Sequence, residues 1–419
     1  MTEKPPGSFR ILHTADWHLG KLLIDQSREE EHDRFLDWLL DVVKEQEIDA
    51  IILAGDVFDT TNPPQSAQER YFNFVSALHR QGDCSLVVIA GNHDSAAHLE
   101  APRMVLSALN THVVGSPAED PQARILFLPD DDNPRVAIAM LPFLRERDLR
   151  IGRAWERASE IRAKVVAGIK CRYDETAEAV TAAGVTCQVV ATGHLTVRGT
   201  VDSDSERDIH IGGLGEVSSD IFPETFSYIA LGHLHRPQSI EGDNRVCYAG
   251  SPIALSFSEA EDVKEVRIVD VTQDRITQNG LPIPVQRRLA QLRTTNAELE
   301  KAIQEFDPVP GELRTWVEVF IEDVSTEQDL FDRVCRLADD QDFDVLKVVR
   351  AKANPGVGMD AGESTDDEAF ESLLNDPASV FDHLLEQQPQ YDDEDIQNLR
   401  AAFAELVELN EQSEPLEAS

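Results

Sequence analysis

Positive charge is scarce in this sequence. Its 38 Lys and Arg residues are opposed by 78 Asp and Glu residues, which gives a formal net charge of −40. Such a chain repels phosphate backbones at long range, so its composition excludes a generally basic nucleic-acid-binding surface. A polyanionic substrate would need metal ions, local arginines or a partner protein. Only nine of the basic residues are lysines, and we hypothesise adaptation to high ionic strength, which screens self-repulsion. Indifference of stability and activity to desalting would count against that hypothesis.

Paired cysteines and long apolar runs are also lacking. The five cysteines are scattered and form no CxxC pair, which argues against a disulfide framework or a zinc ribbon. No apolar run approaches the roughly 18 residues of a membrane span, and residues 1–8 contain no apolar segment of a secretory signal. We therefore expect a soluble protein of the cytoplasm.

The chain is long enough for two or three domains. From residue 10 to residue 90, apolar runs of strand length alternate with amphipathic helical stretches. Further strand-like runs follow up to residue 271, with a long helix expected within 153–183. Residues 1–281 thus predict an α/β fold, with two sheets flanked by helices. Residues 282–352 predict a small α/β domain in the order helix 296–305, strand 314–321, helix 327–339 and strand 345–349.

The C-terminal part of the sequence has a different composition. Residues 353–370 are rich in Gly, Pro and acidic residues, which predicts a flexible linker. Within 371–412, apolar residues recur at helical spacing after capping residues, so two amphipathic helices are expected. These helices either pack on the main body as a hairpin or dock another protein, because an apolar stripe beyond a linker has no obvious local partner.

Five short polar clusters each follow an apolar run. A ligand site in a doubly wound sheet lies beyond the carboxyl ends of the strands, and the glycines in the clusters permit sharp turns there. Carboxylate, amide and imidazole donors without thiolates suit Mn²⁺, Mg²⁺, Fe or Zn²⁺. One such cluster alone carries little weight, since it can be an ordinary turn, but five in this order predict a two-metal phosphoesterase site. They are Asp16-Trp17-His18, Gly55-Asp56-Val57-Phe58-Asp59, Gly91-Asn92-His93-Asp94, Gly193-His194 and Gly232-His233-Leu234-His235.

The order of these clusters, DxH, GDxxD, GNHD, GH and GHxH, resembles that of the calcineurin-like metallophosphoesterases. The segments 13–20, 228–238 and 250–257 are similar, more narrowly, to the SbcD family of bacterial nuclease subunits. The resemblance implies two divalent ions, Mn²⁺ or alternatively Mg²⁺, with Asp56 as the bridge between them. It assigns one ion to Asp16, His18, Asp56 and His235, and the other to Asp56, Asn92, His194 and His233.

The same resemblance implies that His93 stabilises the transition state or protonates the leaving oxygen; a purely structural turn histidine is the alternative. We expect Asp94 to orient the imidazole of His93. Asp59 has two open interpretations: a hydrogen bond near Asp56, or a cap of the turn before Pro63.

The residue after Asp59 and the family resemblance indicate the substrate and the partner. Protein phosphatases of this superfamily carry an arginine after the second aspartate of the GDxVDRG motif, whereas Thr60 follows Asp59 here, so diester cleavage is favoured over monoester cleavage. The resemblance implies a double-strand 3′–5′ exonuclease and single-strand or hairpin endonuclease in DNA repair, recombination and replication. It also implies an SbcC-type coiled-coil ATPase partner that is gripped by 371–412, and a homodimer within a heterotetramer. Candidate DNA contacts, or else plain surface ion pairs, are Arg103, Arg145, Arg147 and Arg198.

Two other functions remain open. One is a phosphodiesterase or phosphatase for small nucleotides, and the other is a scaffold that mainly docks the ATPase.

Overall fold

The computed structural model describes residues 3–149, 158–203, 205–206, 216–309, 311–322 and 329–350, with residues 381, 400 and 403. The chain divides into two compact units: residues 1–152 with 156–353, and residues 153–155 with 354–419. In the second unit the rings of Phe381 and Phe403 stack, with centroids 4.1 Å apart. The expected linker 353–370 and the rest of the expected helical segment 371–412 lie outside the described residues.

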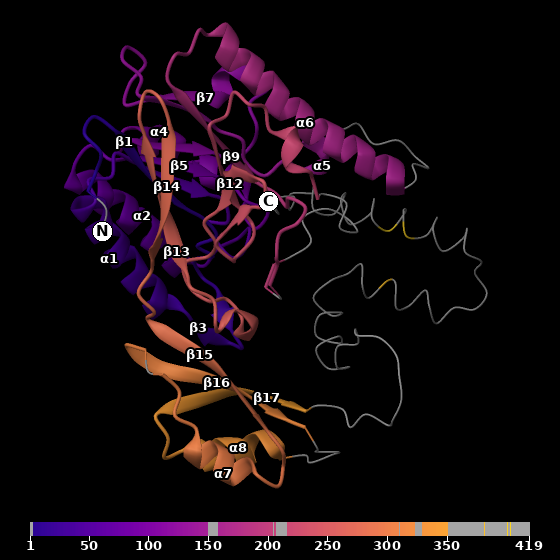
Figure 1. Cartoon of the computed structure of the whole chain (residues 1–419). Coiled ribbons are helices and arrows are strands. Elements are labelled where there is room, and N and C mark those ends of the chain that lie inside the picture. The colour runs from indigo at the N-terminus through magenta and orange to yellow at the C-terminus, as the bar shows by residue number, and fades with distance from the viewer. Residues whose placement is uncertain are drawn as a thin grey trace, which may run out of the picture. The chain divides into compact units, whose positions relative to one another are not determined.

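The first sheet has the strand order β14-β13-β1-β4-β5-β6 (Figure 1). Its strands β1, β4, β5 and β6 run parallel, while β13 and β14 pair antiparallel. Helices cover its outer face, where Leu39 and Phe74 pack against Leu12 and Ile51. The strands are β1 (Phe9–Thr14), β4 (Ala50–Ala54), β5 (Ser85–Ile89), β6 (Thr111–Val114), β13 (Glu265–Val271) and β14 (Ile276–Pro282), and the helices are α1 (Glu29–Glu45), α2 (Gln65–Gln81), α3 (Ala96–Glu100) and α4 (Arg103–Ser107).

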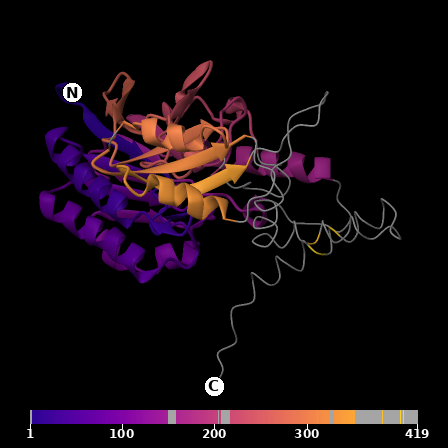
Figure 2. The ribbon, with the colours of Figure 1, turned by 90° about the horizontal axis from the view of Figure 1, so that it is seen from below.

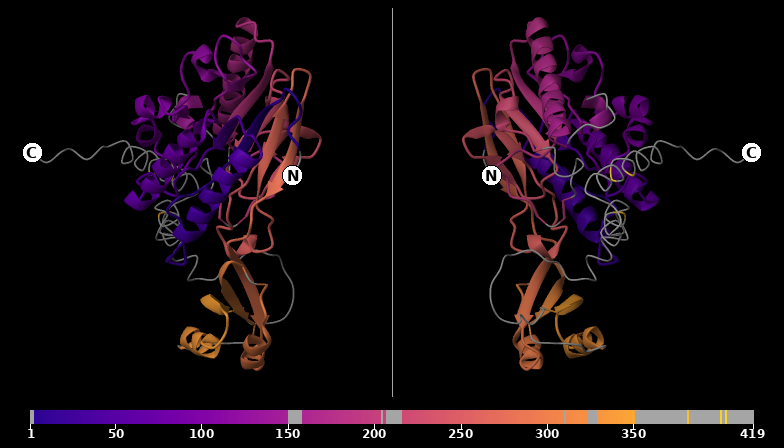
Figure 3. Two further views of the ribbon diagram at one scale, coloured as in Figure 1. Left: turned by 90° about the vertical axis from the view of Figure 1, so that its left-hand side faces the viewer. Right: turned by 90° about the vertical axis from the view of Figure 1, so that its right-hand side faces the viewer.

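The second sheet has the order β11-β12-β10-β9-β8-β7. Its outer face is covered by α6 (Ala158–Ala182), the long magenta helix of Figure 3, through Ile169 and Tyr173. A short helix, α5 (Glu146–Leu149), lies beside α6. The strands are β7 (Ile125–Leu128), β8 (Val136–Ala139), β9 (Gln188–His194), β10 (Tyr228–Gly232), β11 (Gln238–Ile240) and β12 (Asp243–Tyr248).

The inner faces of the two sheets share a core that includes Ile11, Ile52, Val190 and Ala230. Alternate residues of one strand therefore enter different cores, since Leu12 joins the helices and Ile11 joins the opposite sheet. Burial on both faces explains why these strands are continuous apolar runs. The α/β architecture with two sheets agrees with the prediction from the sequence.

A third, all-parallel sheet, β15-β16-β17, forms the small domain with two helices packed on one face (Figure 2). The prediction for this region was wrong in one respect, because it missed the first strand. In that strand only Ala290 and Gln291 lie between the buried Leu289 and Leu292, and arginines flank the pair on both sides, so no long apolar run marks it. The elements are β15 (Arg287–Thr294), α7 (Leu299–Glu305), β16 (Leu313–Ile321), α8 (Leu330–Ala338) and β17 (Phe343–Arg350).

The small domain is joined to α1 by a buried ionic and aromatic cluster. Glu31 accepts hydrogen bonds from Arg28 and from Arg287, each at 2.8 Å. The guanidinium of Arg287 lies 4.2 Å from the ring centroid of Trp316, and that of Arg28 lies 5.5 Å from it. Arg28 also donates to the carbonyl oxygen of Ala254 at 2.7 Å, so one cluster holds both the small domain and the loop after β12.

Within the stretches that the structure describes, no helix is both long enough and apolar enough to cross a membrane.

Candidate metal centre

The predicted ligands lie where parallel strands end. Asp16 follows β1, Asp56 follows β4, and His233 follows β10, while His194 is the last residue of β9. Among the described residues, eight non-glycine residues have positive φ, and four of them are Asp16, His18, Asp56 and His233. Such a conformation is uncommon outside glycine and gathers at functional sites. The chain thus turns sharply at the positions where the side chains converge.

Asp56 lies at the centre of the cluster. Its Oδ2 is 3.5 Å from Nε2 of His18 and 3.4 Å from Nε2 of His194. Its Oδ1 accepts a hydrogen bond from the backbone N–H of His93 at 2.9 Å. One carboxylate oxygen therefore stands between imidazoles that come from two different sheets.

Gly91 and Gly55 lie so close to Asp56 and His194 that only glycine fits at these positions. A Cβ at Gly91 would lie 2.1 Å from Oδ1 of Asp56, and a Cβ at Gly55 would lie 2.1 Å from Nδ1 of His194. No side chain fits at either position without moving a predicted ligand.

In the part of the chain that the structure describes, two buried polar atoms of the cluster lack a hydrogen-bond partner, whose place a bound cation could take. One donor atom each from Asp16, His18 and Asp56 lies within 4.8 Å of the other two. Oδ2 of Asp16 and Nε2 of His18 are buried and have no hydrogen-bond partner among the described residues. Buried polar atoms are rarely left unpaired, and a carboxylate oxygen and an imidazole nitrogen both ligate divalent metals. The residues present therefore fit a divalent cation.

The other predicted ligands surround the same point. Nδ1 of His194 donates to the carbonyl oxygen of Ala54 at 3.0 Å, which directs its Nε2 to Oδ1 of Asn92 at 2.9 Å. The backbone N–H of His233 donates to Asp16 at 2.8 Å. The ring of His235 lies 5.0 Å from that of His18, centroid to centroid. The fold thus brings all seven predicted ligands together.

The electrostatics of the cluster also favour a cation. Burial opposes ionisation of Asp56, but the charges of His194 and His18 hold the pKa of Asp56 well below its usual range. Burial opposes protonation of His194, yet the carboxylates of Asp56 and Asp16 raise its pKa to about 9. In the metal-free protein a proton on His194 neutralises part of this buried negative charge, which a divalent ion would neutralise more fully.

His93 and Asp94 both contact backbone groups of the ligand loops. Nδ1 of His93 is 2.7 Å from the carbonyl oxygen of Asp59. The carboxylate of Asp94 instead accepts from the backbone N–H groups of Gly91, Val57 and Phe58 at 2.9 to 3.1 Å. Asp94 therefore ties two ligand loops together, and the carbonyl oxygen of Asp59 contacts the His93 ring. The orienting role of Asp94 towards that ring stays a prediction.

Asp59 and Asp56 contact opposite nitrogens of the same histidine, His18. Its Oδ1 lies 3.2 Å from Nδ1 of His18 and 3.2 Å from Nζ of Lys21. Asp59 is thus the partner of a predicted ligand, and with His18 and His93 it forms a second group of possible metal donors.

Of the four arginines proposed for DNA contact, one contacts a residue of the site and three are exposed. Arg145 is built into the site, because it donates to the carbonyl oxygen of Asp94 at 3.3 Å. Arg147 lies 3.9 Å from Asp148 in an exposed ion pair, while Arg103 and Arg198 are exposed.

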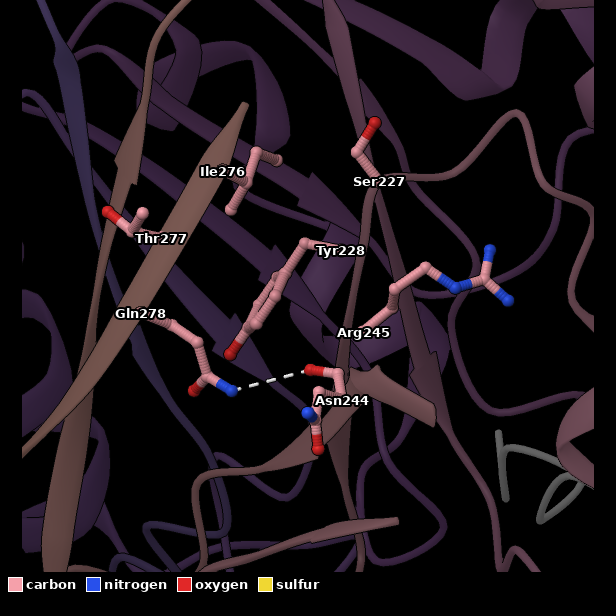
Figure 4. A pocket seen from close by; sticks show the side chains of 7 residues that line it. All are labelled: Ser227, Tyr228, Asn244, Arg245, Ile276, Thr277 and Gln278. Carbon is pink, nitrogen blue, oxygen red and sulfur yellow. Dashed lines mark hydrogen bonds between the residues drawn. The ribbon is translucent and has the colours of Figure 1, made fainter. Parts of the chain in front are cut away.

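A separate hollow lies at the amino ends of β10 and β12, between the two sheets (Figure 4). None of the predicted site residues lines it. Its arginine, Arg245, is paired with Asp243 at 2.7 Å, and Gln278 donates to the backbone of Asn244 at 3.4 Å. The hollow contributes nothing to the metal centre.

Two family models match parts of this chain. Residues 9–157 match the calcineurin-like phosphoesterases, and residues 285–389 match the type 5 capsule protein repressor C-terminal domain of SbcD proteins. Among solved structures, a dimetal phosphatase from Danio rerio covers 64% of this chain and 98% of its own, with 12% identity and a TM-score of 0.37. The family model and the buried His/Asp cluster define a calcineurin-like phosphoesterase.

Curated relatives narrow the family. The SbcD subunit of the nuclease SbcCD from Escherichia coli K12 is 39% identical over 350 residues, which are 82% of this chain and 85% of the relative. The same subunit from Rhodobacter capsulatus is 38% identical over 68% of this chain and 71% of its own length. The chain belongs to the SbcD family of nuclease subunits.

Proposed function

We propose that this chain is a Mn²⁺-dependent DNA nuclease of the cytoplasm, a double-strand 3′–5′ exonuclease and single-strand or hairpin endonuclease that works with an SbcC-type ATPase. The observation that carries the proposal is the buried cluster in which Oδ2 of Asp16 and Nε2 of His18 have no hydrogen-bond partner among the described residues. The relatives are named as one subunit of the nuclease SbcCD, which supports the substrate class and the partner.

In this proposal the first ion is held by Asp16, His18, Asp56 and His235, and the second by Asp56, Asn92, His194 and His233. The position of Asp56 Oδ2 between His18 and His194 supports its role as the bridge. Two such ions, when bound, activate a water molecule and neutralise charge on the phosphodiester. Mg²⁺ suits the same donors, so the two metals are compared directly in the test below.

His93 acts on the leaving oxygen or on the charge that develops at phosphorus. Its Nδ1 lies 2.7 Å from the carbonyl oxygen of Asp59, and this contact sets the orientation of the ring. Asp94 supports catalysis by positioning the loop that carries His93.

Two further surfaces fit the assembly. Phe72 on α2 and Met104 and Val105 on α4 are exposed, the last two by 82% and 66%, on the helical layer of the first sheet. We propose a homodimer within a heterotetramer, and these exposed apolar side chains are candidates for its contacts. The segment 371–412 is assigned to the ATPase, and deletion of residues 370–419 should abolish its co-purification with the ATPase while sparing hydrolysis of a small diester.

The proposed activity is tested on end-labelled duplex, hairpin and single-stranded DNA, with Mn²⁺ or Mg²⁺ and with or without the ATPase. A small phosphomonoester is assayed in parallel. The expected result is Mn²⁺-dependent DNA cleavage that Asp56→Asn abolishes, whereas the exposed Asp37→Asn on α1 cleaves normally. Turnover of the monoester alone would support a phosphatase instead, and metal binding without any hydrolysis would support a scaffold.

A further inference from the structure

His235 is held by polar side chains that lie outside the predicted motifs. Its Nδ1 is 2.5 Å from the hydroxyl oxygen of Ser205, and its backbone N–H donates to Glu206 at 2.7 Å. Its carbonyl oxygen accepts a hydrogen bond from Nζ of Lys264 at 2.8 Å. The ring, the amide and the carbonyl of one predicted ligand are therefore each fixed by a different residue.

Glu259 connects these contacts. Its side chain is fully buried and forms an ion pair with Lys264 at 2.6 Å. It also accepts a hydrogen bond from the backbone N–H of Leu255 at 3.2 Å and from the hydroxyl of Ser205. A buried carboxylate that faces an ammonium group is ionised and can only accept hydrogen bonds.

The direction of the hydrogen bonds follows from this. A serine hydroxyl has one proton to donate, and next to the Glu259 carboxylate that proton points to the carboxylate. The oxygen of Ser205 is then the acceptor for Nδ1 of His235. His235 must therefore carry its proton on Nδ1, which leaves the lone pair of Nε2 free.

We propose that Ser205 and Glu259 are positioning residues for His235, which select the tautomer whose Nε2 binds the first metal ion. Outer partners of metal-bound histidines fix the tautomer and the ring orientation in this way, and their loss costs about 10- to 100-fold in metal affinity. This inference rests on the proposed ligand role of His235. It adds Ser205, Glu259 and Lys264 to the residues on which the first ion depends.

The test measures Mn²⁺ binding to the full chain by isothermal titration calorimetry. Ser205→Ala should weaken one of two sites by about 10- to 100-fold and leave the other unchanged, while Ser205→Thr, which keeps the hydroxyl, should restore it. Ser256→Ala is the matched control, because Ser256 donates to the same carboxylate at 3.2 Å. It should bind both ions as the unmodified chain does.

His235→Gln separates the inference from the proposal on which it rests. If His235→Gln loses one ion and Ser205→Ala binds both with native affinity, Ser205 has no positioning role although His235 remains a ligand. If His235→Gln itself binds both ions normally, the ligand role and the inference both fail. If Ser205→Ala and Ser256→Ala weaken Mn²⁺ binding equally, the effect comes from a general disturbance around Glu259, and the inference is overturned.

A second measurement needs no variant of Ser205. In the metal-free chain at pH 8, with ¹⁵N-labelled histidine, the ring signals of His235 are assigned by their loss in His235→Gln. The expected signals are a protonated Nδ1 and an unprotonated Nε2. A proton on Nε2 would contradict the inference even if every variant lost metal.

Discussion

Asp59 Oδ1 accepts a hydrogen bond from Nδ1 of His18 at 3.2 Å, so Nε2 is the nitrogen that His18 turns towards Asp56. The two residues lie at the ends of different strands of the first sheet, and the same carboxylate contacts Lys21. Asp59 thus fixes a predicted ligand without lying in the predicted ligand set.

Asp59→Ala should therefore weaken binding of the first ion by about 10- to 100-fold. The reason is that the His18 ring loses the partner that sets its tautomer and orientation. Mn²⁺ titration measures the effect, and Asp37→Ala, which removes an exposed aspartate of α1, is the control. Complete loss of both ions would instead assign Asp59 to the metal directly, in the group that it forms with His18 and His93.

His93→Ala should retain both metal ions and lose catalysis. We expect kcat on a DNA substrate to fall by about 10²- to 10⁴-fold, the usual contribution of a general acid or base. Mn²⁺ stoichiometry is measured on the same preparation. A variant that binds both ions and cleaves at the native rate would leave His93 with a structural role only.

Loss of the buried ion pairs at the junction of α1 and the small domain should cost more stability than loss of the exposed pair between them. Glu31→Ala leaves Arg28 and Arg287 buried without their shared partner, and loss of one partner of a buried pair costs about 3–5 kcal/mol of unfolding free energy. Glu312→Ala removes an exposed pair with Arg34 across the same two domains and should cost less than about 1 kcal/mol. Urea unfolding compares the two variants, and equal costs would contradict the interpretation.

The buried His13 should make the protein less stable to unfolding in acid. Its ring contacts the hydroxyl of Tyr228 at 3.0 Å and the carbonyl oxygen of Leu231 at 3.1 Å, and so joins β1 to β10. Burial, together with the charge of Arg267, lowers the pKa of His13 to about 3. The unfolded chain binds this proton near pH 6.5, so stability is full above that pH and falls as the pH drops towards 3.

The contribution of His13 is about 1.4 kcal/mol per pH unit within that window. In His13→Gln, which can still donate to Leu231 and accept from Tyr228, the free energy of unfolding should depend less steeply on pH by this amount. Urea titrations between pH 6 and pH 4 measure the difference. Identical slopes would show that His13 is already protonated in the folded protein.

Much of the fold and of the centre was predictable for a physical reason. β1, β4 and β5 are buried on both faces, so each is an apolar run that local sequence reveals. The prediction missed the edge strands β6, β7, β11 and β14, which are partly exposed, and an edge strand needs no continuous apolar run. It also missed β12, an interior strand in which only the last three residues are buried.

The sequence by itself determined the donor atoms of the metal centre and their place after the strands. Parallel neighbours end at one edge of a sheet, so Asp16 and Asp56 had to lie near one another once β1 and β4 paired. His194 ends a strand of the second sheet, and only the packing of the two sheets brings it to Asp56. Only the tertiary structure decided the partners of those donors. Glu259 reaches Ser205 across 54 positions and Arg287 reaches Glu31 across 256, and no local pattern encodes contacts that depend on how separate loops and domains pack.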